Sequence, residues 1–213
     1  MLEEVVKRAA AELREREEAR DEVLSRARRA RTLSKQAILL IHNGALEDAG
    51  AKIGDAKGLL EELAPYLSGH VGLEGLDSVN AAREEYAEAS ILHGLKTTGA
   101  FPSPESVGVP LYSYLLGLGD VVGELRREAL DSLRLGDLAA AEADLRLMEE
   151  IYLSLLSMEE ASLFLKGLRR KLDVARKVIE STRSDLTAEA GRRQLSEAVK
   201  MLAKKIKEGR GGG

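Results

Sequence analysis

Residues 82–89 read Ala-Arg-Glu-Glu-Tyr-Ala-Glu-Ala and residues 116–125 read Leu-Gly-Leu-Gly-Asp-Val-Val-Gly-Glu-Leu. We predict that both of these acidic stretches are helical. At about 100° per residue, Glu85 and Glu88 lie about 60° apart on the first helix. Asp120 and Glu124 lie about 40° apart on the second. The two carboxylates of each pair therefore lie on one side of their helix.

The second stretch is an unusual setting for acidic residues. Between Ser106 and Leu125, Asp120 and Glu124 are the only Asp, Glu, Lys, Arg or His residues. Their neighbours are mostly Leu, Val, Tyr and Gly, whereas a solvent-exposed helix face would also carry Lys and Arg. A carboxylate among apolar neighbours needs a cation, a partner chain or a proton.

Packing of the two acidic helices against each other would bring four carboxylates together. Carboxylate oxygens are ligands that Mg²⁺ and Mn²⁺ prefer. Such an ion activates water and neutralises charge on a phosphodiester. If the helices pack in this way, four residues form the kind of site that takes Mg²⁺ or Mn²⁺: Glu85, Glu88, Asp120 and Glu124.

The two stretches also resemble the translin family, and in particular its catalytic branch, translin-associated factor X (Trax). That branch has Glu-Tyr-x-Glu-Ala on one helix, and Tyr-Leu-x-Gly followed by Asp-x-x-Gly-Glu-Leu on a later helix. Residues 85–89, 114–117 and 120–125 match these patterns. The resemblance extends over roughly residues 25–186 and is closer to archaeal members encoded by a single gene.

This resemblance implies a fold and an activity. The implied fold is an all-α protomer of the translin type, a bundle of roughly seven helices that assembles into a closed, octameric shell with RNA inside. The implied activity is that of a metal-dependent endoribonuclease, with the same four carboxylates at its centre. Helical periodicity alone predicts only an α-helical bundle.

The composition fits a helical protein without disulfides. Of the 213 residues, 44% are hydrophobic and 3% are aromatic, so aliphatic side chains must form the core. The chain has no Cys, which agrees with a reducing compartment. It has no signal-peptide pattern and no long uncharged apolar run, so we expect a cytoplasmic protein without a membrane span. We expect one translin-like domain over residues 1–208 and a flexible, Gly-rich tail over residues 209–213.

Apolar periodicity and the Pro and Gly residues predict where helices begin and end. The predicted helices are 2–41, 46–64, 77–98, 110–135, 138–156, 159–183 and 189–207. Pro65 is expected to end the second helix. Ser103-Pro104-Glu105 is a helix start, and Gly136-Asp137 ends one helix and caps the next. The last predicted helix is a departure from eukaryotic Trax, which usually ends near the preceding helix.

Three glycines inside the predicted helix 110–135 require a physical reason: Gly117, Gly119 and Gly123. Each costs a helix about 1 kcal/mol relative to alanine. We expect the close approach of another backbone, or of a ligand, at this helix.

The net charge is −4, so basic residues must be concentrated locally if RNA is the ligand. The run 14–22 is nearly all charged and is expected to be a solvated helix face. The segment 26–35 differs because its basic residues are not interleaved with acids. We expect it to contact RNA phosphates or to form salt bridges between subunits, through Arg26, Arg28, Arg29, Arg31 and Lys35.

Two further basic residues lie close to the acidic pairs in helical projection. Lys96 lies about 20° from Glu85, and Arg127 lies about 20° from Asp120. We expect both to contact RNA phosphate, and Arg127 to stabilise transition-state charge. The alternatives are a surface role for Lys96 and an ion pair with Glu124 for Arg127. The three histidines have no metal-ligand spacing and are expected to be structural or on the surface.

The leading hypothesis is a Mg²⁺- or Mn²⁺-dependent endoribonuclease that cleaves single-stranded or nicked RNA as a homo-oligomer. The competing hypothesis is a non-catalytic, translin-like protein that binds RNA or single-stranded DNA, whose activity chelators would leave intact. A third is a scaffold that buries the acids in salt bridges and has no RNA affinity at low salt. Dependence on a divalent ion separates the first hypothesis from the other two.

Overall fold

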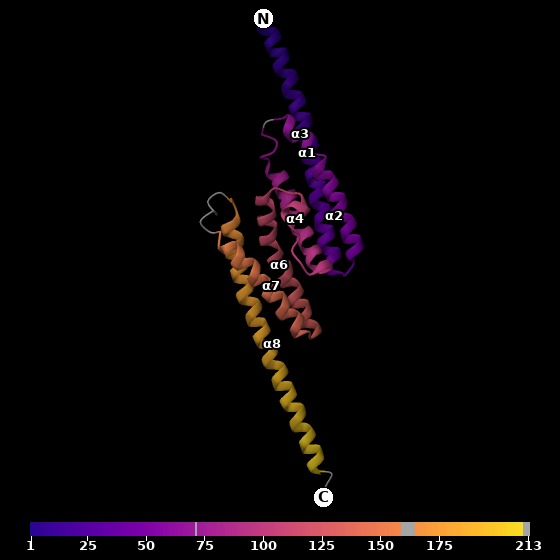
Figure 1. The fold of residues 1–213 in the computed structure, drawn as a ribbon, viewed down its shortest axis with the longest axis vertical. Coiled ribbons are helices and arrows are strands. Elements are labelled where there is room, and N and C mark those ends of the chain that lie inside the picture. The colour runs from indigo at the N-terminus through magenta and orange to yellow at the C-terminus, as the bar shows by residue number, and fades with distance from the viewer. Residues whose placement is uncertain (71, 159–164, 211–213) are drawn as a thin grey trace. The chain divides into compact units, whose positions relative to one another are not determined.

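The computed structural model describes residues 1–70, 72–158 and 165–210, which are helical and contain no β-strand (Figure 1). The helices in these ranges are α1 (Leu2–His42), α2 (Leu46–Glu61), α3 (Ala64–Gly69), α4 (Asp77–Thr98), α5 (Pro104–Val107), α6 (Leu111–Leu135), α7 (Leu138–Leu156) and α8 (Leu168–Arg210). Among the described helices, none is long and apolar enough to cross a membrane. The predicted all-α class is confirmed.

The chain divides into two compact units, Met1–Val121 and Val122–Gly213, which are described separately below. The single domain expected over residues 1–208 stays a prediction. In the tail expected over residues 209–213, α8 continues to Arg210, and residues 211–213 lie outside the described part of the chain.

The first unit is built on α1, α2 and α4, which pack against one another (Figure 1). Small residues line these contacts: Ala27 of α1 and Ala82 of α4 are fully buried in one cluster with Leu63. Alanine side chains let helices approach closely, and Val23 and Val79 fill the space between them. This packing fixes α1 and α4, the helices that carry Arg31 and Glu85.

The connection from α4 to α6 is held by side chains that bond to its backbone. Ser103 caps α5 by accepting a hydrogen bond from Ser106 N at 3.2 Å, so the predicted helix start is confirmed. Tyr114 Oη donates to Pro102 O at 2.7 Å. Tyr86 Oη donates to Val107 O at 3.1 Å. These bonds tie the loop to both acidic helices.

Replacement of Tyr86 by Phe is expected to lower stability at neutral pH by about 1 kcal/mol, because the bond to Val107 O is lost. Burial raises the pKa of Tyr86, so its protonated form is favoured in the folded state. That contribution is complete below the ordinary tyrosine pKa of about 10 and is lost as the pH rises further. Urea unfolding at about pH 8 and about pH 11 should show that the variant loses less stability than the wild type as the pH rises. An equal loss would contradict this role.

The second unit contains the end of α6 with α7 and α8. Gly136 has φ +81° and Asp137 Oδ1 accepts from Ala140 N at 3.0 Å, which confirms the predicted Gly-Asp turn. Arg126 donates to Val178 O at 3.1 Å and to Thr182 Oγ1 at 2.7 Å. These bonds attach α8 to this part of α6.

Two predicted helix boundaries were wrong. Pro65 does not end α2, which stops at Glu61; it lies in the first turn of α3, where its missing N–H group costs nothing. The break expected between residues 183 and 189 is absent, because α8 runs continuously from Leu168 to Arg210. Ser184 and Thr187 turn their hydroxyls onto backbone carbonyls one turn earlier, at 3.1 and 2.8 Å. The predicted helix 159–183 begins with residues 159–164, which lie outside the described part of the chain.

Candidate functional site

Glu85 is held by two cations from α1. Its Oε2 atom accepts from Arg31 Nε at 3.0 Å and lies 3.8 Å from Lys35 Nζ. The Glu85 side chain is 16% exposed, whereas those of Arg31 and Lys35 are 50% and 58% exposed. The sequence led us to expect RNA contacts or salt bridges between subunits for this basic segment. Within one chain, Arg31 and Lys35 form ion pairs with Glu85, a predicted metal ligand, and the expected RNA and intersubunit contacts stay predictions.

Glu88 lies one turn further along α4 and is buried, with 8% of its surface exposed. It lies where α4 meets α6 at Gly117. A Cβ atom on Gly117 would come within 2.7 Å of Glu84 O and 2.9 Å of Glu88 N. The close backbone approach expected at the glycines of α6 is therefore confirmed at Gly117. Around Gly123 there is open space, with no described atom within 4 Å of a Cβ.

The two acidic helices run in the same direction. Tyr112, in the first turn of α6, donates to Asn80 Oδ1 at 3.1 Å and accepts from Arg83 Nη1 at 3.3 Å, near the start of α4. Gly117, one and a half turns later, contacts α4 at residues 84–88. Asp120 follows Gly117 by three residues and is partly buried, so it comes from the side of α6 that faces α4.

The four carboxylates do not form a ready-made metal site in the described residues. No group of three or more His, Cys, Asp or Glu side chains in residues 1–70, 72–158 and 165–210 is arranged to hold a metal ion. Glu124 is partly buried and belongs to the second unit, and Glu88, Asp120 and Glu124 each have an interaction partner in the chain. The donor chemistry fits Mg²⁺, because all four are hard oxygen ligands and three come from helices in contact. The site itself stays a prediction.

The other predicted RNA contacts lie on exposed surfaces. Arg28 and Arg29 are exposed on α1, and Arg28 Nε donates to Leu24 O at 3.2 Å. Lys96 is exposed in the last turn of α4, and Arg127 is exposed on α6 in the second unit. These positions leave each side chain accessible to a large ligand.

His93 has the structural role expected for the histidines. Its Nε2 lies 3.0 Å from Leu46 O, which ties α4 to the start of α2. His70 Nδ1 lies 3.2 Å from Tyr66 O.

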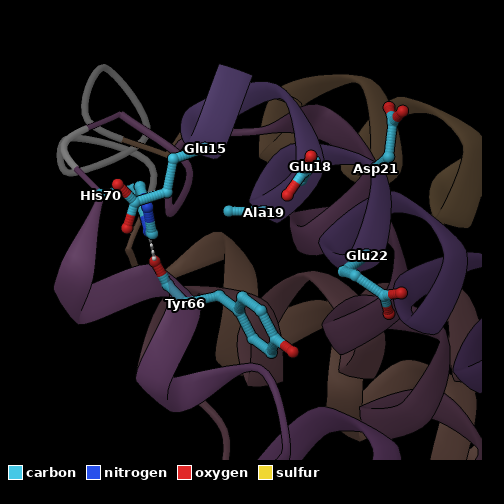
Figure 2. A pocket seen from close by; sticks show the side chains of 7 residues that line it. All are labelled: Glu15, Glu18, Ala19, Asp21, Glu22, Tyr66 and His70. Atoms are coloured by element: carbon cyan, nitrogen blue, oxygen red, sulfur yellow. Dashed lines mark hydrogen bonds between the residues drawn. The ribbon is translucent and has the colours of Figure 1, made fainter. Parts of the chain in front are cut away.

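The sequence interpretation missed an acidic cavity of about 640 Å³ between α1 and α3. Figure 2 shows its lining residues, which are Glu15, Glu18, Ala19, Asp21, Glu22, Tyr66 and His70. The charged run 14–22 was interpreted only as a solvated face. The spacing of its acids at three and four residues was the available signal, because it places them on one side of a helix. Four carboxylates repel phosphate, so RNA is not expected here.

Arg26 contacts Glu22 and Tyr66, two of the residues that line this acidic cavity. It donates to Glu62 Oε2 at 3.1 Å, pairs with Glu22 and lies 5.2 Å above the centre of the Tyr66 ring. The hydrogen bond to Glu62 raises the pKa of Arg26, and Glu22 acts in the same direction. Arg26 is therefore a structural member of the basic segment, which sequence alone did not separate from its neighbours.

Comparisons with known proteins identify solved structures that this chain resembles over most of its length. AfC3PO, solved alone and as a complex with duplex RNA, is 36% identical to this chain with a TM-score of 0.80 in each case. Each match covers 89% of this chain and 98% of that one. Apo-NeC3PO is 26% identical with a TM-score of 0.77 and covers 86% of this chain and 96% of its own.

An uncharacterised protein of Methanocaldococcus jannaschii is 31% identical over 125 residues, which are 58% of this chain and 56% of that protein. The chain thus matches little more than half the length of this relative. The translin family model matches residues 66–182, which is more than half of the chain and includes both acidic stretches. The chain therefore belongs to the translin family.

Proposed function

We propose that this protein is a Mg²⁺- or Mn²⁺-dependent endoribonuclease that cleaves single-stranded or nicked RNA inside a closed homo-octameric shell. The observation that carries the proposal is the contact of two acidic helices at Gly117, which sets buried Glu88 beside the face of α6 that bears Asp120. The similarity to AfC3PO supports RNA as the ligand, because that protein was solved with duplex RNA.

Glu85, Glu88, Asp120 and Glu124 would hold the metal. When bound, the ion supplies an activated water and neutralises charge on the phosphate. The basic residues of the chain have a separate task, which is to hold the RNA backbone. Lys96 and Arg127 are exposed cations on the two acidic helices and would contact phosphates next to the carboxylates.

Arg31 and Lys35 would hold RNA phosphate beside Glu85, because both are about half exposed and lie within 4 Å of its carboxylate. Replacement of both by Ala should lower the slope of log RNA affinity against log salt concentration by about two. This is close to one for each phosphate that is no longer neutralised. RNA binding is measured by fluorescence anisotropy over a series of salt concentrations.

The matched control is Lys7→Ala with Arg8→Ala, which removes the same charge from an exposed part of the same helix. An unchanged slope in the Arg31/Lys35 variant would show that these two residues serve only as ion-pair partners of Glu85.

A second candidate function is non-catalytic binding of RNA or single-stranded DNA. Two observations favour it: Glu85 is already paired with two cations, and the described residues contain no group of three metal-binding side chains. A carboxylate neutralised by arginine and lysine is a weaker metal ligand than a free one.

Chelation separates the two functions. Purified protein is incubated with end-labelled single-stranded RNA and with nicked duplex RNA, in Mg²⁺ or in EDTA, and the products are resolved on a denaturing gel. We expect internal cleavage in Mg²⁺ and none in EDTA. Binding without cleavage in both conditions would establish the second function, and cleavage that persists in EDTA would exclude a metal-dependent centre.

A further inference from the structure

The two longest helices each extend beyond the packed part of their unit. We call residues 2–18 of α1 the N-terminal arm and residues 194–208 of α8 the C-terminal arm. In the N-terminal arm every residue except the partly buried Ala10 is exposed, and Ala19 is the first buried residue of α1. Every residue of the C-terminal arm is exposed, and the last buried residue of α8 is Leu186.

Each arm carries an apolar stripe that is exposed in the described structure. In both arms the spacing is four, three and four residues, which is the a/d spacing of a coiled-coil seam. The stripes are Leu2, Val6, Ala9 and Leu13 in the N-terminal arm, and Leu195, Val199, Leu202 and Ile206 in the C-terminal arm. Leu2 is 77% exposed and Leu195 is 66% exposed, so neither stripe is covered by its own unit.

Each arm continues a helix that is packed further along, so it needs no separate nucleation, but its apolar stripe gains nothing from burial while it is exposed to water. The ion pairs along the arms do not change this. Lys7 pairs with Glu3 at 3.0 Å and Lys204 with Glu208 at 3.8 Å, and exposed pairs of this kind add little to helix stability. The exposed stripes of both arms are therefore surfaces that fit a partner helix.

The charges of the arms identify that partner. The N-terminal arm has six glutamates and four basic residues, whereas the C-terminal arm has four lysines and two glutamates. Like arms would repel, and unlike arms attract. In the heptad set by the two stripes, the charged residues that flank the seam are Glu3, Glu12 and Glu17 in the N-terminal arm and Lys205 in the C-terminal arm.

We propose that the C-terminal arm of one copy of this protein packs along the N-terminal arm of a second copy as a two-helix coiled coil. The contact is heterologous, so each copy offers one arm to each of two neighbours, and such contacts close into rings when the rotation allows it. This inference rests on the assembly part of the proposed function and names the surface that performs it.

The absence of cysteine in the sequence makes a direct test available. One protein carries Val6→Cys and a second carries Leu202→Cys, and the two are mixed, allowed to exchange subunits and treated with a short bismaleimide. We expect a covalent heterodimer in the mixture. The matched control pairs Leu202→Cys with Asp55→Cys, an exposed position on α2, and should give no heterodimer.

Three outcomes would overturn the inference: no heterodimer in the mixture, an equal yield with the Asp55→Cys control, or a Leu202→Cys protein that cross-links efficiently to itself. A chain that carries both cysteines and cross-links only within itself would also overturn it.

Two further sets of replacements test the physical basis of the contact. Leu195→Gln with Val199→Gln, added to the Leu202→Cys protein, removes apolar surface without adding charge and should lower the yield of the cross-link to the Val6→Cys protein at least about tenfold. Lys205→Glu should also lower the yield, and Glu12→Lys with Glu17→Lys in the partner arm should restore it. A charge-reversed arm that cross-links normally, or is not restored, contradicts the charge argument.

Three measurements together separate this inference from the proposed function: light scattering for the oligomeric state, the cross-link for the contact between arms, and the RNA assay for cleavage. A wild-type protein that is oligomeric and cleaves RNA, but shows no contact between the arms, overturns the inference alone. A protein whose arms cross-link between copies, but which does not cleave RNA, supports the inference and contradicts the nuclease.

Discussion

Glu88→Gln combined with Asp120→Asn should reduce RNA cleavage by at least about 100-fold, because it removes two of the four negative charges that would hold the metal. Both replacements keep the shape of the side chain. Glu88 is buried against α6, so an amide of the same size preserves the packing at Gly117. RNA affinity should stay within about threefold of wild type, because the phosphate contacts come from basic residues. Cleavage is measured under single-turnover conditions, and binding is measured by anisotropy.

The matched control is Glu142→Gln with Glu150→Gln, which removes two exposed acids from α7. This variant should cleave RNA at the wild-type rate. Equal cleavage by the Glu88/Asp120 variant and the control would refute the assignment of these carboxylates. Loss of RNA binding together with cleavage would show instead that the pair maintains the fold.

Gly117→Ala should lower the free energy of unfolding by about 1–3 kcal/mol, although alanine is the better helix former. The added Cβ would lie 2.7 Å from Glu84 O and 2.8 Å from Ala87 Cβ, and neither atom is at the end of a flexible side chain. The two acidic helices would have to separate. We therefore expect cleavage to fall together with stability, as measured by urea unfolding and by the RNA assay.

Gly123→Ala on the same helix is the matched control. No described atom lies within 4 Å of a Cβ added at this position, so the helix propensity of alanine should increase stability by up to about 1 kcal/mol. If both variants change stability in the same direction, the contact at Gly117 is not the reason for its glycine.

Local signals in the sequence were sufficient for much of the fold. The predicted helices 77–98 and 138–156 agree with α4 and α7 at both ends. Their limits are set by residues next to them in the chain, such as Gly99 with φ +71° and the capping Asp137. The prediction failed where a side chain could either end a helix or hydrogen-bond back to the helix backbone. Ser184 and Thr187 were interpreted as a break, but both bond back to the helix, and Leu186 between them is buried.

The candidate site was less predictable because it depends on contacts between distant residues. The acidic stretches are visible in the sequence, but the pairing of Glu85 with Arg31 crosses 54 positions. Helical periodicity places Arg31 and Lys35 on one face without showing what that face meets. The contact at Gly117 was predictable in kind, because a glycine in a helix costs stability, but its partner residues were not.

Direct measurement of Mn²⁺ binding tests the central claim, which is that the carboxylates of α4 and α6 hold a divalent cation. Free Mn²⁺ is titrated by electron paramagnetic resonance against the wild-type protein and the Glu88→Gln, Asp120→Asn variant, both without RNA. We predict that the wild-type protein binds Mn²⁺ and that the variant loses this binding while its mass in solution is unchanged. Equal binding by the two proteins, or no binding by the assembled wild-type protein, would contradict the claim.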